Sequence, residues 1–267
     1  MALQKEIWLA DIIEPLFASN TFAARAVDHS AFVTNKRVHV PNAGAPPAVV
    51  KNRAELPATA TQRADADLDY AIAEYTTDPV HIVHAEEVEL SYNKRQSVIA
   101  FMRSALADKV HLDLLDAWIG GANSMTKETL DKDGVLELMT AFDEQDVPQT
   151  GRCLILTPSA YATLLMSLTN FEGQSFLASA NAQTGVVGRL YGFDVYQRSA
   201  VSADAATNNV YALAWQENSV SRALGATELF TDDQNPLYYG DIFSALVRAG
   251  GAVARADKKG VLAVKSK

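Results

Sequence analysis

The chain has 267 residues, of which 48% are hydrophobic and 21% charged, and its formal net charge is −9 at pH 7. This is the composition of a globular protein that is long enough for one large domain or for two smaller ones. The acidic charge and the lack of a basic stripe argue against a protein that holds nucleic acid by its phosphates.

The chain has one cysteine, Cys153, which lies in an aliphatic run and is expected to be a small buried hydrophobic residue. A disulfide within one chain is therefore excluded, which suits synthesis in the cytoplasm. Glu6 and Asp11 interrupt the apolar residues near the start, so no signal peptide is expected. No run of residues approaches the ~20 apolar positions of a membrane span.

Residues 1–35 have the pattern of an arm. Ile7-Trp8-Leu9 and Ile12-Ile13 are apolar, but Pro15 follows, and the Ser19-Asn20-Thr21 cluster is typical of a turn. A segment of this kind has too few apolar residues for a core of its own. We therefore expect it to pack on another surface.

Residues 36–96 predict an extended arm of two strands. Val38 and Val40 indicate a short strand that is expected to stop at Pro41, and pairing is expected to resume at 70–75. A loop as long as the one between these strands is rare in compact domains unless it has a function. An isolated ribbon needs a surface to lie on, such as a neighbouring subunit. A disordered surface loop is the alternative. A further alternating strand is expected at 87–92.

Residues 97–119 give the clearest helix prediction. Apolar residues recur every three or four positions from Ile99 to Trp118, Ser97 is suited to the N-cap, and Gly120-Gly121 is suited to the end. Such a helix is about 35 Å long and would act as a spine.

The remaining elements are mixed, so the predicted class is α+β. Helices are expected at 135–142 and 158–168, and a flexible loop at 170–190. Strands are expected at 152–157, 193–197 and 210–215, in a final stretch at 242–247 with Val253, and in a hairpin around Lys258-Lys259-Gly260.

No catalytic or metal site is indicated. His81 and His84 are three residues apart, so in a strand their imidazoles point to opposite faces. Asp131-Lys132-Asp133-Gly134 is similar to a calcium loop, but Thr129 and Thr140 stand where ligands are needed. Dinucleotide, phosphate-loop and nucleophile-elbow motifs are missing. We expect neither an enzyme nor a bound cofactor.

The order of elements resembles that of the tailed-phage major capsid proteins of the Hong Kong 97 fold. Several strings carry this resemblance, and it extends over nearly the whole chain. These strings are Tyr70-Ala71-Ile72-Ala73-Glu74-Tyr75-Thr76-Thr77-Asp78-Pro79, Ala141-Phe142-Asp143-Glu144-Gln145-Asp146-Val147-Pro148, Gly188-Arg189-Leu190-Tyr191-Gly192-Phe193-Asp194-Val195-Tyr196, and Tyr238-Tyr239-Gly240-Asp241.

The resemblance implies a division of the chain into functional parts. They would be an N-terminal arm at 1–35, an extended loop at 36–96, a peripheral domain with the spine helix at 97–150, an axial domain at 151–240 and a C-terminal return to the peripheral domain at 241–267. The resemblance also implies pentamers and hexamers of this chain in an icosahedral virion. The shell would be assembled in the bacterial cytoplasm and would enclose double-stranded DNA without reading its sequence.

The implied partners are a separate scaffolding protein, a portal and decoration proteins. The charged residues of the extended loop suit salt bridges that set the register between subunits, or they keep a free loop soluble. Lys51 lies where some members of the family form a covalent crosslink, although a simply solvated lysine is the more common case. The predicted assembly residues are Arg53, Glu55, Arg63, Asp65, Asp67 and Asp69, with Trp8 in the arm and Arg103 on the spine helix.

Two other readings of the sequence are left open. One is an encapsulin-like bacterial nanocompartment shell, which has the same fold and assembles without a scaffold. The other is a monomeric α+β enzyme with an unrecognised site, which the lack of a catalytic constellation disfavours.

Overall fold

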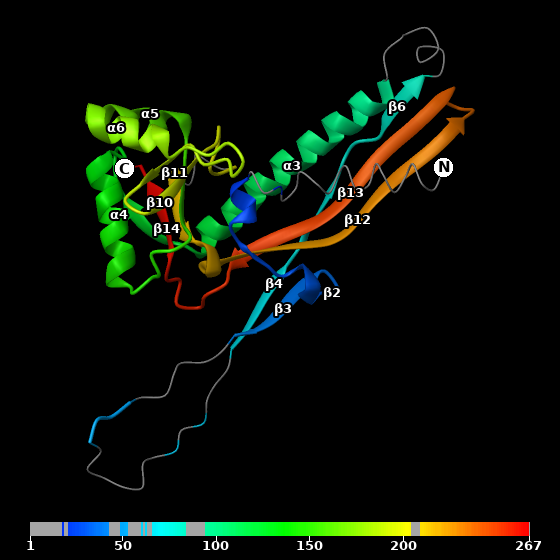
Figure 1. Ribbon diagram of the computed structural model, residues 1–267. Helices are drawn as coiled ribbons and strands as arrows, with labels where there is room; N and C mark the ends of the chain where they lie inside the picture. The colour runs from blue at the N-terminus through cyan, green and yellow to red at the C-terminus, as the bar shows by residue number, and fades with distance from the viewer. Residues whose placement is uncertain are drawn as a thin grey trace.

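The computed structural model describes residues 18, 21–42, 49–52, 60, 62, 66–83, 94–203 and 209–266. Within these residues the chain forms a long narrow sheet, a broader sheet with helices, and a small arm sheet that projects from the body (Figure 1).

The long sheet is built on the antiparallel strands β12 (Val220–Asn235) and β13 (Gly240–Val253). β5 (Ala73–Thr76) and β6 (Val80–Val83) pair with the other edge of β13, and β1 (Val27–Asp28) pairs in parallel with the start of β12. Both long strands run away from the six-stranded sheet, with α3 and β6 alongside them (Figure 1).

The helix α3 (Lys94–Gly121) runs along one face of the long sheet (Figure 1). Leu106 and Val110 of the helix pack against Leu229, Ala245 and Val247 of β12 and β13 in a shared buried cluster. The predicted spine helix is confirmed, but it begins at Lys94, before the expected N-cap.

The broader sheet has six strands, flanked by three helices. In spatial order the strands are β7 (Asn123–Thr126), β14 (Val261–Lys265), β11 (Val210–Gln216), β8 (Arg152–Leu156), β10 (Phe193–Gln197) and β9 (Gly188–Leu190). The helices are α4 (Lys132–Glu144), α5 (Pro158–Ser167) and α6 (Asn170–Ala178).

Both faces of this six-stranded sheet are covered. Every residue of β8 is buried, and its alternate side chains enter two different cores. Ile155 packs with Trp118 of α3, whereas Leu154 packs with Leu138 and Phe142 of α4. A strand covered on both faces has a continuous apolar sequence, which explains why 152–157 was predictable.

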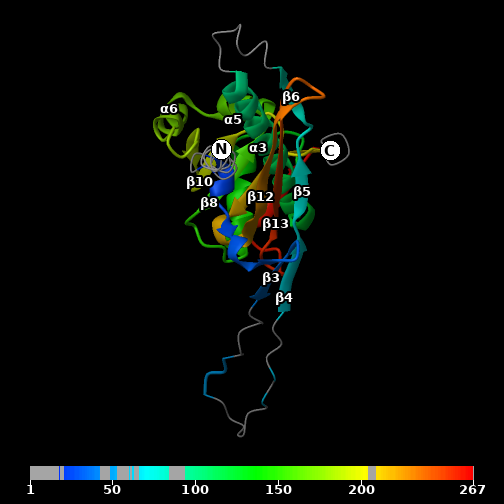
Figure 2. The ribbon, with the colours of Figure 1, turned by 90° about the vertical axis from the view of Figure 1, so that its right-hand side faces the viewer.

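The arm sheet consists of β2 (Val33–Thr34), β3 (Arg37–Asn42) and β4 (Ala66–Ala71). Figure 2 shows β3 and β4 leaving the body together at one end of the molecule. The predicted two-stranded arm is therefore present at its root. The strand expected at 87–92 and residues 1–17 of the predicted N-terminal arm lie outside the described residues.

The expected stop at Pro41 is wrong, because β3 continues to Asn42. β2 pairs only with Arg37 and Val38, so Pro41 lies where β3 is an edge strand with β4 on its other side. Proline is tolerated at such an edge, since no ladder hydrogen bond is required on the open side.

The flexible loop expected at 170–190 is also wrong, because it contains α6 and β9. Thr169 and Glu172 form a reciprocal capping box that starts α6, and this signal was overlooked. Phe176 is buried, and Gly188 lies directly against its ring, so the small residue is needed for this contact.

The hairpin expected around Lys258 to Gly260 is not formed. β13 belongs to the long sheet and β14 to the six-stranded sheet, so this turn carries the chain from one sheet to the other. The chain also passes between these sheets after α3 and after β11. The domain boundaries expected at 150 and 240 stay predictions, and the long sheet joins β12 to β13 across the second of them.

Candidate assembly surface

The β3–β4 ladder, which we call the arm root, has one apolar face. This face packs on the body of the molecule. In the β3–β4 ladder, Val38 is opposite Tyr70, and these buried side chains pack with Ile72 and with Ala223 of β12. The hydroxyl of Ser221, also on β12, is 3.3 Å from the Tyr70 hydroxyl. The arm therefore leaves from an anchored root.

The opposite face of the arm root carries charges that pair across the two strands. Arg37 donates from Nε to Oδ1 of Asp69 at 2.8 Å and forms a second contact through its Nη2. These hydrogen bonds hold the pKa of the Asp69 carboxyl below its usual range. His39 Nδ1 lies 3.4 Å from an oxygen of Asp67. Cross-strand pairs of this kind fix the register of a hairpin.

The predicted assembly residues therefore fall into two groups. Asp67 and Asp69 lie in β4 and contact His39 and Arg37 of the same chain, and Arg103 lies half-buried on α3. Their role in contacts between subunits stays a prediction. The others lie outside the described residues: Trp8, Arg53, Glu55, Arg63 and Asp65.

An N-terminal segment, residues 21–28, joins the two larger sheets, and we call it the strap. Its Phe22 is buried, with its ring centroid 6.0 Å from that of Trp118 on α3 and 6.2 Å from that of Trp215 on β11. Arg198 Cζ lies over the same ring, 5.7 Å from its centroid. The strap is thus inserted between α3 and the six-stranded sheet.

Arg25 of the strap is held by two carboxylates. Its Nη2 donates to Asp194 of β10 at 2.6 Å, and its Nη1 lies 2.6 Å from Glu217, which follows β11. Asp194 is nearly buried and also contacts Arg189. Two residues later the strap becomes β1 and pairs with β12, so this one segment contacts both larger sheets.

Among the exposed large apolar side chains, two groups bear on assembly. One group surrounds the far end of the long hairpin, where Phe230, Leu237, Tyr238 and Tyr239 are exposed. Another lies on α5 and α6, where Met166 and Phe171 are more than 80% exposed. Grouped exposed apolar residues mark surfaces that another molecule covers.

No candidate metal centre is found among the described residues. They contain no group of three or more His, Cys, Asp or Glu side chains that could hold a metal ion. Burial raises the pKa of the Cys153 thiol, which opposes a nucleophilic role. His81 lies against the ring of Tyr238, and Asp131 caps α4 by accepting a hydrogen bond from the backbone of Gly134.

The described helices include none that is long and apolar enough to cross a membrane.

Sequence comparison finds no relative: no protein-family model matches the chain, and no curated protein matches it. Comparison of structures finds clear neighbours. The capsid structure of the cyanophage P-SCSP1u matches with a TM-score of 0.70 at 13% identity, covering 93% of this chain and 88% of that chain.

Two further structures have similar scores. A Mycobacterium phage Che8 structure matches with a TM-score of 0.69 at 17% identity, covering 92% of this chain and 90% of the other. The virus-like particle from Pyrococcus furiosus matches with a TM-score of 0.64 at 11% identity, covering 98% and 99%. The chain therefore has the α+β fold of Hong Kong 97-type capsid proteins, as the sequence resemblance implied.

Proposed function

We propose that this chain is the major capsid protein of a tailed double-stranded DNA bacteriophage and that copies of it assemble into the icosahedral head. The observation that carries the proposal is the match over more than nine-tenths of the chain to the cyanophage capsid structure. The projecting arm root and the exposed apolar groups at the far ends of the body supply surfaces that assembly would cover.

In this proposal the parts of the fold have separate roles. The six-stranded sheet with α4, α5 and α6 serves as the axial domain, which meets its copies around five-fold and quasi-six-fold centres. The long sheet with α3 serves as the peripheral domain. This proposal follows the sheets, so it moves α4 to the axial domain and β12 to the peripheral domain, unlike the sequence-based division at 97–150 and 151–240. Within residues 36–96, the part beyond the root of β3 and β4 serves as the extended loop that lies on a neighbouring subunit, whereas β5 and β6 belong to the long sheet of their own chain. Many modest contacts repeated by symmetry then give a stable shell.

The proposed partners follow from this role. A separate scaffolding protein directs assembly in the cytoplasm of the bacterial host, and portal and decoration proteins join the shell. The shell encloses DNA as a wall, because the chain carries a net charge of −9, which does not favour binding to phosphates. The role is structural and involves no catalysis.

A first experiment is expression of the chain alone and together with the products of its neighbouring genes. Size-exclusion chromatography and negative-stain electron microscopy should show capsomers, tubes or closed shells. A species that stays at the monomer mass of 28.8 kDa under both conditions would contradict the proposal and favour the enzyme reading.

An encapsulin-like nanocompartment shell is the second candidate, favoured by the match to the Pyrococcus furiosus virus-like particle over nearly the whole of both chains. The same experiment separates the two functions. A capsid protein needs its scaffolding partner for uniform shells. A nanocompartment protein forms uniform small shells alone and retains a host protein inside them.

A further inference from the structure

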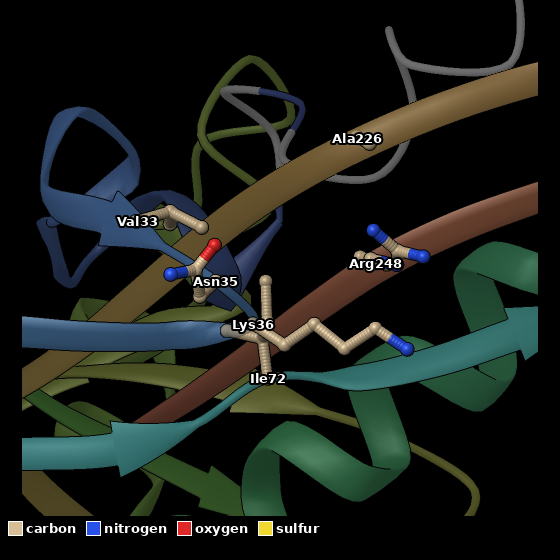
Figure 3. A pocket seen from close by; sticks show the side chains of 6 residues that line it. All are labelled: Val33, Asn35, Lys36, Ile72, Ala226 and Arg248. Carbon is tan, nitrogen blue, oxygen red and sulfur yellow. The ribbon is translucent and has the colours of Figure 1, made fainter.

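A hollow lies at the arm root, where the arm sheet meets the long sheet. Its volume is 460 Å³, and it is lined by Val33, Asn35, Lys36, Ile72, Ala226 and Arg248 (Figure 3). The arm sheet, the link between β4 and β5, and both long strands each contribute to it. We call it the root pocket.

The root pocket has an apolar floor and a cationic side. Ile72 is buried at its base, and the Lys36 and Arg248 nitrogens lie on the same side of Ile72 in Figure 3. Arg248 Nε donates to Glu74 Oε2 at 2.9 Å, and Lys36 Nζ lies 3.4 Å from the same oxygen. These contacts lower the pKa of Glu74 below its usual range.

The charges of the root pocket are not balanced. Two cations share one oxygen of one carboxylate, which leaves a net positive charge. Within the described residues, both Nη atoms of Arg248 are without a hydrogen bond to the protein. A guanidinium in this state can still bind a second carboxylate through two parallel hydrogen bonds.

The sequence keeps the root pocket open by placing small residues in β12. The ladder between β12 and β13 shifts between Leu224 and Thr227, and Gly225 and Ala226 form the bulge. A Cβ at Gly225 would lie 2.6 Å from Ile72 Cδ1 and 3.1 Å from Arg248 Cβ. Glycine there lets Ile72 form the floor and Arg248 stand beside it.

We propose that the root pocket binds an aspartate or glutamate side chain of a second copy of this chain. The methylene groups of the incoming side chain would cover Ile72, and its carboxylate would contact Arg248 and Lys36. This inference rests on the proposed function and names one contact within the shell. Binding would join the arm sheet to the long sheet through a neighbour and so fix the direction in which the arm leaves.

The net negative charge of the chain favours a carboxylate side chain as the occupant of the root pocket. The chain has 32 acidic and 23 basic residues, so each copy presents its neighbours with an excess of carboxylates. Cationic side chains are outnumbered by acidic ones, and opposite charge at a contact sets which surfaces meet. The pocket also lies where the extended loop departs toward the adjacent subunit, so a second copy must approach it in the proposed shell.

The test uses assembled shells and a carbodiimide, which joins a lysine amine to a carboxylate in contact with it. After denaturation, chains that are linked to another copy migrate at twice the chain mass or more. Chains that carry only internal links migrate as monomers. Mass spectrometry of the dimer band should find Lys36 linked to an Asp or Glu. Lys36→Arg, which keeps the charge but not the amine, should abolish this link.

Three further variants complete the test. Lys109→Arg is the matched control, because Lys109 is an exposed lysine paired with Asp113 on α3, and it should leave the Lys36 link unchanged. Arg248→Gln should lower the yield of the Lys36 link several-fold, and Arg248→Lys should restore part of it.

The outcomes separate the two hypotheses. One outcome is that shells form while Lys36 is linked only to Glu74 of its own chain, in the monomer band, or is not linked at all. This result would overturn the root-pocket proposal but would not contradict the capsid function. Failure to form shells with any partner would overturn the capsid function, and the root-pocket proposal with it.

Discussion

Arg25 and Asp194 are 169 residues apart in the sequence, yet Nη2 of Arg25 lies 2.6 Å from Oδ2 of Asp194. The contact joins the N-terminal strap to the six-stranded sheet at the place where that sheet meets the long one. The same strap pairs with β12 two residues later, so it contacts both larger sheets.

Replacement of Arg25 by glutamine should therefore destabilise the unassembled subunit. Asp194 is almost buried and would keep only Arg189, so the expected loss is roughly 1–3 kcal/mol in the free energy of unfolding. Urea unfolding measures this loss. Arg255→Gln is the control, since Arg255 forms an exposed pair with Asp257, and it should change stability by less than about 1 kcal/mol. Equal effects of the two variants would contradict a structural role for the strap.

Phe22 anchors the same strap through packing. Its ring lies edge-on to Trp118, Trp215 and His111, so Phe22→Ala leaves a cavity between α3 and the six-stranded sheet. The expected cost is about 3–5 kcal/mol, with a change in tryptophan fluorescence of the native state. Phe171→Ala, at an 82% exposed position, should cost less than about 0.5 kcal/mol. A cost below about 1 kcal/mol for Phe22→Ala would show that the strap is not part of the core.

Substitution by alanine should have opposite effects on stability at Gly251 and at Gly173. A Cβ at Gly251 would overlap the Leu114 side chain and the Ser221 carbonyl, which accepts a hydrogen bond from Trp118 Nε1 at 3.0 Å. Gly251→Ala should lower stability by about 1–3 kcal/mol. Gly173 lies inside α6 with open space around it, so Gly173→Ala should raise stability by about 0.5–1 kcal/mol. Thermal unfolding distinguishes the signs, and the same sign at both positions would contradict the packing described.

His29 should make stability depend on pH. Burial lowers its pKa, partly opposed by Asp28, and its Nδ1 is buried without a hydrogen-bond partner in the described residues. The unfolded chain therefore takes up a proton at a higher pH than the folded chain does. Stability is full above the ordinary histidine pKa of about 6.5 and falls as the pH drops below it.

The variant His29→Phe removes this titrating group and keeps a ring beside Phe32 and Tyr70. Urea midpoints measured between about pH 7.5 and pH 5 should fall less for the variant than for the wild type. The four other histidines are present in both proteins, so the difference isolates His29. If the urea midpoints of the variant and the wild type fall equally with pH, His29 does not contribute to the pH dependence of stability.

Much of the fold was predictable because it follows from local patterns. The apolar stripe of α3 and the apolar residues 153–156 of β8 mark which side chains are buried, and the prolines and charged residues after β3 indicated a long excursion. A helical or strand period depends only on residues close in sequence, so the sequence alone establishes it. α6 was missed although its capping box was present, since its apolar residues do not form a clear stripe.

The candidate assembly surface was predictable only in part. Asp67 and Asp69 were identified as charged residues of the extended loop, but their cross-strand contacts with β3 required knowledge of the ladder register. Lys36, Glu74 and Arg248 are unremarkable in the sequence, and no pattern brings them together. Arg248 meets Glu74 because β13 pairs with β5, and Lys36 joins them at the root pocket from the arm sheet.

The sequence by itself therefore determined the class of the fold, the spine helix and the presence of an arm, since each depends on periodicity and composition over short stretches. Only the tertiary structure decided which strands pair, how the strap joins the two larger sheets and where the charges of the arm root meet. A periodic pattern shows which face of an element is buried. Which distant residue lies against that face depends on the three-dimensional packing of the whole chain.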